Sequence, residues 1–209
     1  MLTRLKQKVQ QALAAEARAA HRIGLTPNIV TGIGGLLAFL SALAYGAWGP
    51  YPSWRTVFLL LAFVFLLLSG FCDALDGIVA RLYGQTTVFG GFLDSLLDRY
   101  ADAAVYAGII VGGLCFPLWG LIAMSGSFLV SYSRARAEAA GIKMESVGLA
   151  ERAERMIILL VATFVAVFWQ SYNVMNVAII ILAMLSNVTV LQRGWYVYGK
   201  LKKKETVEP

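Results

Sequence analysis

The feature that most constrains this chain is the length of its stretches without charged side chains. Residues 23–54, 56–72, 103–133 and 156–192 contain no Asp, Glu, Lys or Arg. A helix needs about 20 apolar residues to cross the hydrocarbon of a bilayer, so these runs predict membrane spans, and two of them are long enough to form two spans each. Charged residues make up 14 % of the chain and hydrophobic residues 59 %, against about 25 % charged in an ordinary globular protein. The sequence therefore predicts an integral membrane protein.

Turn signals divide the apolar runs into six predicted helices. Thr26 and Pro27 are typical of a helix cap followed by the first helical residue. The predicted spans are residues 28–47, 56–72 with a continuation to 82, 90–113, 117–140, 148–170 and 174–198. We therefore expect an all-α integral membrane fold with six transmembrane helices.

The N-terminal stretch is predicted to lie on the membrane rather than to cross it. Leu2, Leu5, Val9 and Leu13 fall on one helical stripe with basic residues beside it, which is typical of an interfacial amphipathic helix. We expect three segments in all. They are a juxtamembrane helix (1–24), a six-span catalytic domain (25–199) and a basic cytoplasmic tail (200–209).

The distribution of charge predicts how the protein is oriented in the membrane. With six spans both termini share one side, and all basic residues except Arg55 then lie on or next to that side. The positive-inside rule assigns this side to the cytoplasm. All acidic residues map to the same half, so we expect a multi-pass cell-membrane protein whose active site faces the cytoplasm. The net charge of +6 is expected to meet anionic lipid headgroups and not nucleic acid.

Five carboxylates lie inside the second and third predicted spans: Asp73, Asp76, Asp94, Asp98 and Asp102. Inserting one carboxylate at mid-span costs roughly 2.5–3.5 kcal/mol on insertion scales. Five such residues therefore indicate a functional site. Spacings of three and four residues put each set on one helical face. Because a short loop joins these spans, we expect them to lie antiparallel with their acidic faces in contact.

Clustered carboxylates either keep protons or bind a cation. Oxygen-only ligands suit Mg²⁺ or Mn²⁺, and the number of negative charges is enough for two ions. The alternative is that the acids form structural ion pairs with Arg81 and Arg99. Two arginines cannot neutralise five carboxylates, which favours the metal site. Asp102 lies deepest, and we expect it to support a ligand or to serve in packing.

Segment 73–98 reads D-A-L-D-G-I-V-A-R, eight further residues, then G-x₃-D-x₃-D. It resembles the signature of the CDP-alcohol phosphatidyltransferase family, D-x₂-D-G-x₂-A-R-x₈-G-x₃-D-x₃-D, with every fixed position filled. The resemblance includes the segment 25–28 (Leu-Thr-Pro-Asn) and covers most of the membrane region. It implies a six-helix protein, usually a homodimer. Such enzymes transfer a phosphatidyl-type group from a CDP-linked lipid to an alcohol and release CMP.

The resemblance also implies roles for single residues. Asp73, Asp76, Asp94 and Asp98 would ligate metal, and Asp98 would also deprotonate the acceptor hydroxyl. The positions that would contact the CDP-lipid are Asn28, Thr31, Gly77, Ala80, Arg81, Thr87 and Gly90. The two glycines would let the nucleotide approach the helices closely, and the arginine would donate to a phosphate.

Arginines near the cytoplasmic ends of the last three spans indicate which alcohol is used. These ends read S-Y-S-R-A-R-A-E (131–138), E-R-A-E-R (151–155) and Q-R (192–193). Several arginines at one wet cavity suit an acceptor that carries a phosphate. The same stretches resemble the phosphatidylinositol-phosphate and archaetidylinositol-phosphate synthase branch of the family. By that resemblance Arg134, Arg155 and Arg193 would hold the phosphate of inositol phosphate, and we add Arg152 by its proximity.

Three other interpretations are left open by the sequence. The arginines could instead anchor helix ends at the headgroups, or pair with Glu138 and Glu151 one helical turn away. Glycerol phosphate also carries a phosphate and is the nearest rival acceptor. A divalent-cation transporter is a remote alternative, since its site should be reachable from both faces and often lies between repeated halves. The chain shows no repeat, and its charges crowd one face.

Overall fold

The computed structural model describes residues 14–144, 147–169 and 172–207, and helices are the only regular structure in these ranges. The elements are α2 (Ala14–Arg22), α3 (Pro27–Ala47), the 3₁₀ turn η1 (Pro52–Trp54), α4 (Arg55–Leu82), α5 (Val88–Val111), α6 (Pro117–Ala139), α7 (Arg152–Trp169) and α8 (Tyr172–Val207). Helices α3 to α8 occupy the six predicted spans, which confirms the all-α fold.

Three stretches are long and apolar enough to cross a membrane by length and composition alone. They are Pro27–Ala47, Pro52–Leu82 and Asn173–Lys203. The other three predicted spans, α5, α6 and α7, each carry charged residues in one half or at one end, and these shorten their apolar stretches. Those charges belong to the site described below.

Local signals explain why some helix boundaries match the prediction and others do not. Helix α3 begins as expected, with the Thr26 hydroxyl accepting from the N–H of Ile29. Helix α7 begins at Arg152 rather than near Gly148, because Gly148 has a φ of +119°. Helix α8 continues to Val207, beyond the predicted end at residue 198, so no helix break separates the basic tail from the last span.

Helix α3 lies between α4 and α5 and packs along both of them. The acidic faces of α4 and α5 meet as expected. The two helices nevertheless make few direct contacts elsewhere, because α3 is wedged between them. Small residues allow the wedge to fit closely: a Cβ on Gly108 or Gly112 would run into the backbone carbonyl of Ala42 or Tyr45. Such small-residue contacts are typical of helix packing in membranes.

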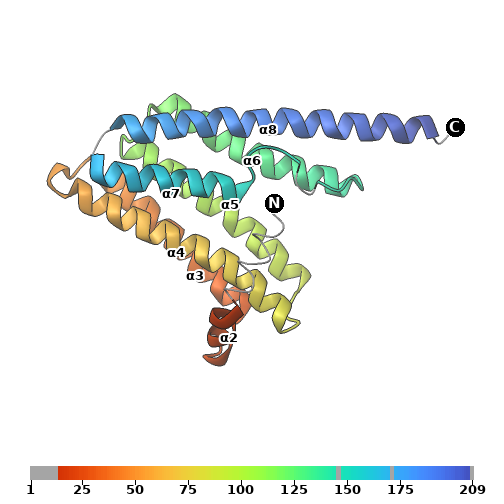
Figure 1. Cartoon of the computed structure of the whole chain (residues 1–209), viewed down its shortest axis with the longest axis horizontal. Coiled ribbons are helices and arrows are strands. Elements are labelled where there is room, and N and C mark those ends of the chain that lie inside the picture. Colours follow the sequence, from red (N-terminus) through yellow and green to blue (C-terminus); the bar gives the residue numbers. More distant parts are fainter. Residues whose placement is uncertain (1–13, 145–146, 170–171, 208–209) are drawn as a thin grey trace.

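The second half of the chain forms a layer against this trio. Helix α6 packs on α8, and α7 connects the two halves by packing on both α4 and α8. The buried hydroxyls of Tyr45 on α3 and Thr163 on α7 form a hydrogen bond of 2.5 Å between the halves. In Figure 1 the η1 turn and the α5–α6 and α7–α8 connections lie at the left, while the last turns of α4, α6 and α8 lie toward the right. The described connections between helices thus lie at two opposite ends of the bundle.

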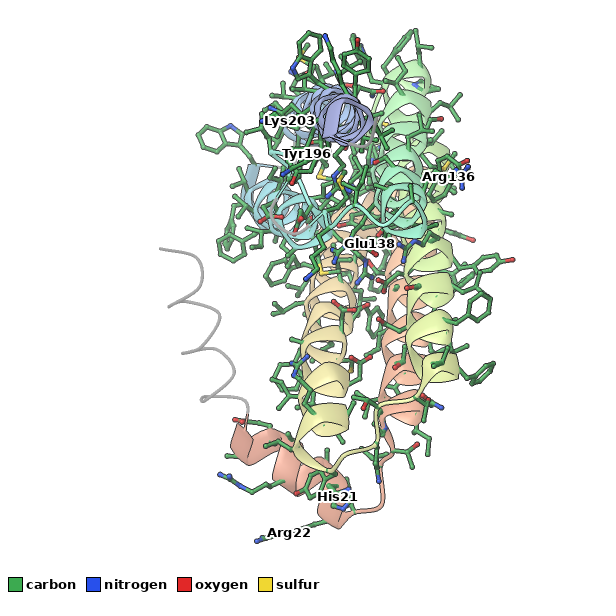
Figure 2. All side chains as sticks on the ribbon, turned by 90° about the vertical axis from the view of Figure 1, so that its right-hand side faces the viewer. His21, Arg22, Arg136, Glu138, Tyr196 and Lys203 are labelled. Carbon is green, nitrogen blue, oxygen red and sulfur yellow. The ribbon has the colours of Figure 1, made fainter. Side chains whose placement is uncertain are left out.

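Helix α2 lies across one end of the bundle (Figure 2). It contacts α4, with Ala17 and Ala20 buried in a small apolar cluster with Val79. The imidazole of His21 stacks on the ring of Tyr83, with 3.5 Å between ring centroids. The helical part of the predicted N-terminal segment is therefore docked on the bundle. The predicted apolar stripe of Leu2, Leu5, Val9 and Leu13 lies outside the described residues.

Candidate active site

Helices α4 and α5 bring three carboxylates together at one point. Asp73 on α4 and Asp94 and Asp98 on α5 each offer one oxygen, and these three oxygens lie within 4.8 Å of one another. One oxygen of Asp94, Oδ1, is buried and has no hydrogen-bond partner among the residues that the structure describes. A buried carboxylate oxygen without a donor is costly, and oxygen ligands alone suit Mg²⁺ or Mn²⁺. These residues therefore fit a hard divalent cation.

Arg152, the first residue of α7, reaches into the same cluster. Its Nη1 lies 2.8 Å from Asp73 Oδ1 and 2.8 Å from Asp98 Oδ1. Asp98 also has Arg99 at 3.8 Å, so one of the ion pairs that the sequence left open is formed. The guanidinium of Arg81 instead lies over Gly77. The principal counter-charge thus comes from α7, and this pairing had no signal in the sequence.

Asp76 lies beside the cluster without belonging to it. Its side chain is buried, and the Thr31 hydroxyl on α3 donates to its Oδ2 at 2.7 Å. Asp76 lines a small cavity together with Asp73 and Asp98, and a larger cleft together with Asp94. The predicted fourth ligand therefore adjoins the other three carboxylates, and its hydrogen bond comes from another predicted site residue.

A cleft of about 240 Å³ opens on one side of the carboxylates. Its walls are Pro27, Asn28, Thr31, Asp76, Gly77, Ala80, Gln85, Thr86, Thr87, Gly90, Gly91 and Asp94. They include every residue expected to contact the CDP-lipid except Arg81. A Cβ on Gly90 would lie 2.9 Å from Thr87 Oγ1 and 3.0 Å from Asn28 Oδ1. A glycine at position 90 therefore keeps the cleft open.

The Thr87 hydroxyl also has a structural task, because it caps α5 by accepting from the N–H of Gly90 at 2.9 Å. This cap fixes where the helix begins. It therefore helps set the positions of Asp94 and Asp98, which follow Gly90 by one and two helical turns.

A second cavity, of about 380 Å³, also adjoins the carboxylates. Its walls are Asp94, Ser95, Asp98, Arg99, Val130, Ser131, Arg134, Ala135, Glu138, Glu151, Arg152, Arg155 and Arg193. All four arginines expected to bind the acceptor phosphate are among them. The structure thus gathers arginines from α6, α7 and α8 around one space.

These four arginines differ in how far they are already paired. Arg134 is exposed and forms the expected pair with Glu138, with 2.9 Å between Nε and Oε1. Arg193 is buried and donates to the carbonyl oxygens of Val147 and Val130 and to Glu151. It therefore also ties α8 to α6 and to the segment before α7. Arg136, the remaining arginine at the end of α6, points away from the bundle (Figure 2).

Arg155 is almost fully buried, with only 3 % of its side chain exposed. Its Nη1 donates to the carbonyl oxygen of Ala150 at 3.1 Å, and its Nη2 lies 3.1 Å from Asp102 Oδ2. Asp102 also accepts from the hydroxyl of Ser127 at 2.8 Å. The spacing of the acids marked Asp102 as part of the acidic face. Nothing in the sequence pointed to Ser127, because a contact between distant helices leaves no periodic pattern.

The cleft and the arginine-lined cavity share Asp94, so the carboxylates stand at their junction. This arrangement allows two molecules to reach the same carboxylates from two separate spaces, one of which is lined by arginines that suit a phosphate. A helical membrane protein with such a centre has the groups that a metal-dependent phosphotransferase needs.

Comparison with known proteins identifies the family within that class. The sequence profile of the CDP-alcohol phosphatidyltransferase family matches residues 24–190. The chain belongs to this family. It is therefore an enzyme, and the cation-transporter interpretation loses its support.

Two curated relatives and two solved structures indicate the branch. The archaetidylinositol phosphate synthase of Pyrococcus horikoshii is 37 % identical over 98 % of this chain and 99 % of its own length. That of Methanothermobacter thermautotrophicus is 42 % identical over 88 % of both chains. Phosphatidylinositol phosphate synthase of Mycobacterium tuberculosis with bound CDP-DAG superposes with a TM-score of 0.72 at 30 % identity, covering 90 % of this chain and 94 % of that one. The same enzyme in complex with manganese and citrate also gives 0.72, at 31 % identity over 88 % of both chains.

Proposed function

We propose that this protein transfers the phosphatidyl or archaetidyl group of a CDP-linked lipid to a hydroxyl of inositol phosphate and releases CMP. One observation carries the proposal: Asp94 lines two cavities at once. One is the cleft that holds the positions expected to contact the nucleotide, and the other is the cavity lined by four arginines. The names of the relatives support the same reaction, since two are archaetidylinositol phosphate synthases.

The metal centre in this proposal consists of Asp73, Asp76, Asp94 and Asp98, with Mg²⁺ or Mn²⁺ and room for two ions. The unpartnered Oδ1 of Asp94 supports it, as does the manganese complex of the mycobacterial enzyme. Bound ions would neutralise the pyrophosphate and stabilise the departing CMP. The cluster of three acids would hold the first ion, and the buried Asp76 beside it would contribute to a second.

The CDP-lipid would enter the cleft, where Asn28, Thr31 and Thr87 present polar groups and Gly77, Ala80 and Gly90 leave space. The guanidinium of Arg81 lies over Gly77 and would donate to a phosphate of the substrate. In the mycobacterial relative the bound lipid is CDP-DAG, which supports a substrate of this kind here.

Asp98 would act as the base because it lines the arginine cavity and joins the carboxylate cluster. It takes the proton of the acceptor hydroxyl as the oxygen attacks the lipid-linked phosphorus. The bond between that phosphorus and the bridging oxygen breaks, and CMP leaves with the electron pair. A base within hydrogen-bonding reach of the attacking hydroxyl accelerates such a step by roughly 10²–10⁴-fold.

The phosphate of the acceptor would bind Arg134, Arg152, Arg155 and Arg193, which line one cavity. A neutral alcohol such as serine or free inositol would not require this charge. Glycerol phosphate would satisfy the same arginines, so it remains the alternative acceptor.

We further propose that α3 to α8 all span the membrane and that α2 belongs to an interfacial segment, residues 1–24. The catalytic domain then covers residues 25–199, followed by the basic tail 200–209. Both termini, the cleft and the cavity would face the cytoplasm, in line with the crowding of basic residues at one end. By family resemblance the protein would be a homodimer.

The test is a panel of acceptors scored by CMP release from purified protein supplied with a CDP-linked lipid and Mg²⁺ or Mn²⁺. We expect release with inositol phosphate, little with glycerol phosphate, none with serine or free inositol, and none for any acceptor after EDTA. Higher turnover with glycerol phosphate would reassign the acceptor. No release with any alcohol would refute the proposal.

A further inference from the structure

Asp102 is the one carboxylate of the acidic face that lies outside both the three-residue cluster and the two cavities that meet there. It follows Asp98 by one helical turn on α5, and 19 % of its side chain is exposed. All its partners come from other helices. Ser127 on α6 donates to Oδ2 at 2.8 Å, Arg155 on α7 lies 3.1 Å from the same oxygen, and Arg152 Nε lies 3.5 Å from Oδ1.

Arg155 depends on this carboxylate for its charge balance. Its guanidinium is almost fully buried, and within the described part of the chain Asp102 is its ion-pair partner. A buried charge without a counter-ion is strongly disfavoured. Besides Asp102, the backbone carbonyl of Ala150 accepts from the guanidinium, and the hydroxyl of Tyr106 on α5 lies close to it. The orientation of Arg155 toward the arginine cavity is therefore set largely by Asp102.

Arg152 forms an ion pair with Asp102 through a different atom. Its Nη1 is shared by Asp73 and Asp98, whereas its Nε faces Asp102. The contact at Nε is an ion pair without a hydrogen bond, so Asp102 attracts the guanidinium of Arg152 electrostatically. Arg152 and Arg155 both line the cavity proposed for the acceptor. One carboxylate thus constrains two arginines of that wall, one of which also contacts the metal-binding carboxylates.

We propose that Asp102 is a positioning residue for the acceptor: it holds Arg155, and attracts Arg152, at the wall of the cavity where the phosphate binds. It does not touch the substrate itself. The inference rests on the proposed function, because it assigns the cavity to a phosphate-bearing acceptor. The competing explanation is that Asp102 serves only stability, as a buried link between α5, α6 and α7.

Asp102→Asn tests the proposal, because it keeps the size of the side chain and removes its charge. We expect the KM for inositol phosphate to rise roughly 10- to 100-fold, the range for losing one hydrogen bond to a charged group. The KM for the CDP-linked lipid should stay within about twofold of the original, since Asp102 does not line the cleft. Equal rises in both KM values, or no rise in either, would overturn the proposal.

A binding measurement gives a second readout without turnover. Calorimetric titration of the protein with inositol phosphate, and separately with inorganic phosphate, in the absence of CDP-lipid should show the same weakening in Asp102→Asn. If wild-type protein releases no CMP with inositol phosphate, the proposed function fails. The titration with inorganic phosphate still tests the inference, and unchanged phosphate affinity in the variant would refute it.

A double-mutant cycle with Arg155→Lys tests whether Asp102 acts through Arg155. If it does, the two substitutions together should weaken phosphate binding by much less than the product of their separate effects. Fully additive effects would contradict this route. Ser41→Ala is the matched control, because the buried Ser41 hydroxyl donates to the Ala62 carbonyl at 2.9 Å and Ser41 lines none of the cavities at the site. It should leave both KM values unchanged.

Should Asp102→Asn fail to accumulate as folded protein, Asp102→Glu keeps the negative charge and lengthens the side chain. We expect this variant to fold and to raise the KM for inositol phosphate by a smaller factor, since the arginines remain paired but are displaced. An acceptor KM equal to that of the wild type would count against the positioning role.

Discussion

The aspartates of the site share one chemistry, but each has different neighbouring groups, and these neighbours determine its role. Asp94 keeps a buried oxygen without a donor, and Asp76 accepts from the hydroxyl of Thr31. Asp98 and Asp73 share one nitrogen of Arg152. The spacing of the acids was enough to predict that they share helical faces. Their partners could not be predicted, because these contacts join helices far apart in the sequence.

For a single residue of the site, we predict that Asp98→Asn lowers kcat by roughly 10²–10⁴-fold, because an amide cannot take up the proton of the acceptor hydroxyl. Binding of the CDP-linked lipid should stay nearly intact, since Asp98 does not line the cleft. CMP release and equilibrium binding of the CDP-lipid measure the two effects. Glu16→Gln on α2, far from the carboxylates in sequence and absent from the cavity walls, is a matched control that should change neither. Equal losses of binding and turnover would disprove the assignment of Asp98 as the base.

Among the helices, the boundaries that were predicted correctly rest on signals within a few residues of the boundary. The cap at Thr26 and Pro27 is such a signal. The start of α7 was predicted too early because Gly148 adopts a positive φ. The segment that follows it is held by Thr189 on α8, which accepts from the N–H groups of Leu149 and Ala150. The end of α8 was predicted too early because loss of apolar character does not by itself end a helix: residues 200–205 are Lys, Leu and Glu, all of which favour helix.

The wedge of α3 between α4 and α5 gives a prediction about stability. Gly108→Ala would place a Cβ against the carbonyl of Ala42, and we expect it to destabilise the protein by about 1–3 kcal/mol, the usual cost of overpacking. Thermal unfolding in one detergent measures the change. Gly199→Ala on α8 is the matched control, because its Cβ would meet nothing within 4 Å. Equal midpoints of thermal unfolding for the two variants would show that the close packing of α3 on α5 contributes nothing to stability.

In the whole molecule, the site exists because six helices of one chain sort their charges to one end. Helices α4 and α5 scarcely touch, yet Asp73 and Asp94 converge beyond the wedge of α3. Helix α7 then supplies Arg152 from the other half of the chain. The sequence predicted the six helices and the acidic centre. It could not predict that α3 would separate α4 and α5, because periodicity indicates which face of a helix is polar but not which helix it meets.

The central claim is that the carboxylates of α4 and α5 form one metal centre. Anomalous diffraction from crystals soaked in Mn²⁺ tests it most directly. We predict a peak about 2.0–2.6 Å from oxygens of Asp73, Asp94 and Asp98, the range for hard cations. The peak should weaken or vanish in Asp94→Asn. Strong peaks only at sites away from these three residues, or no peak under the same soak, would contradict the account.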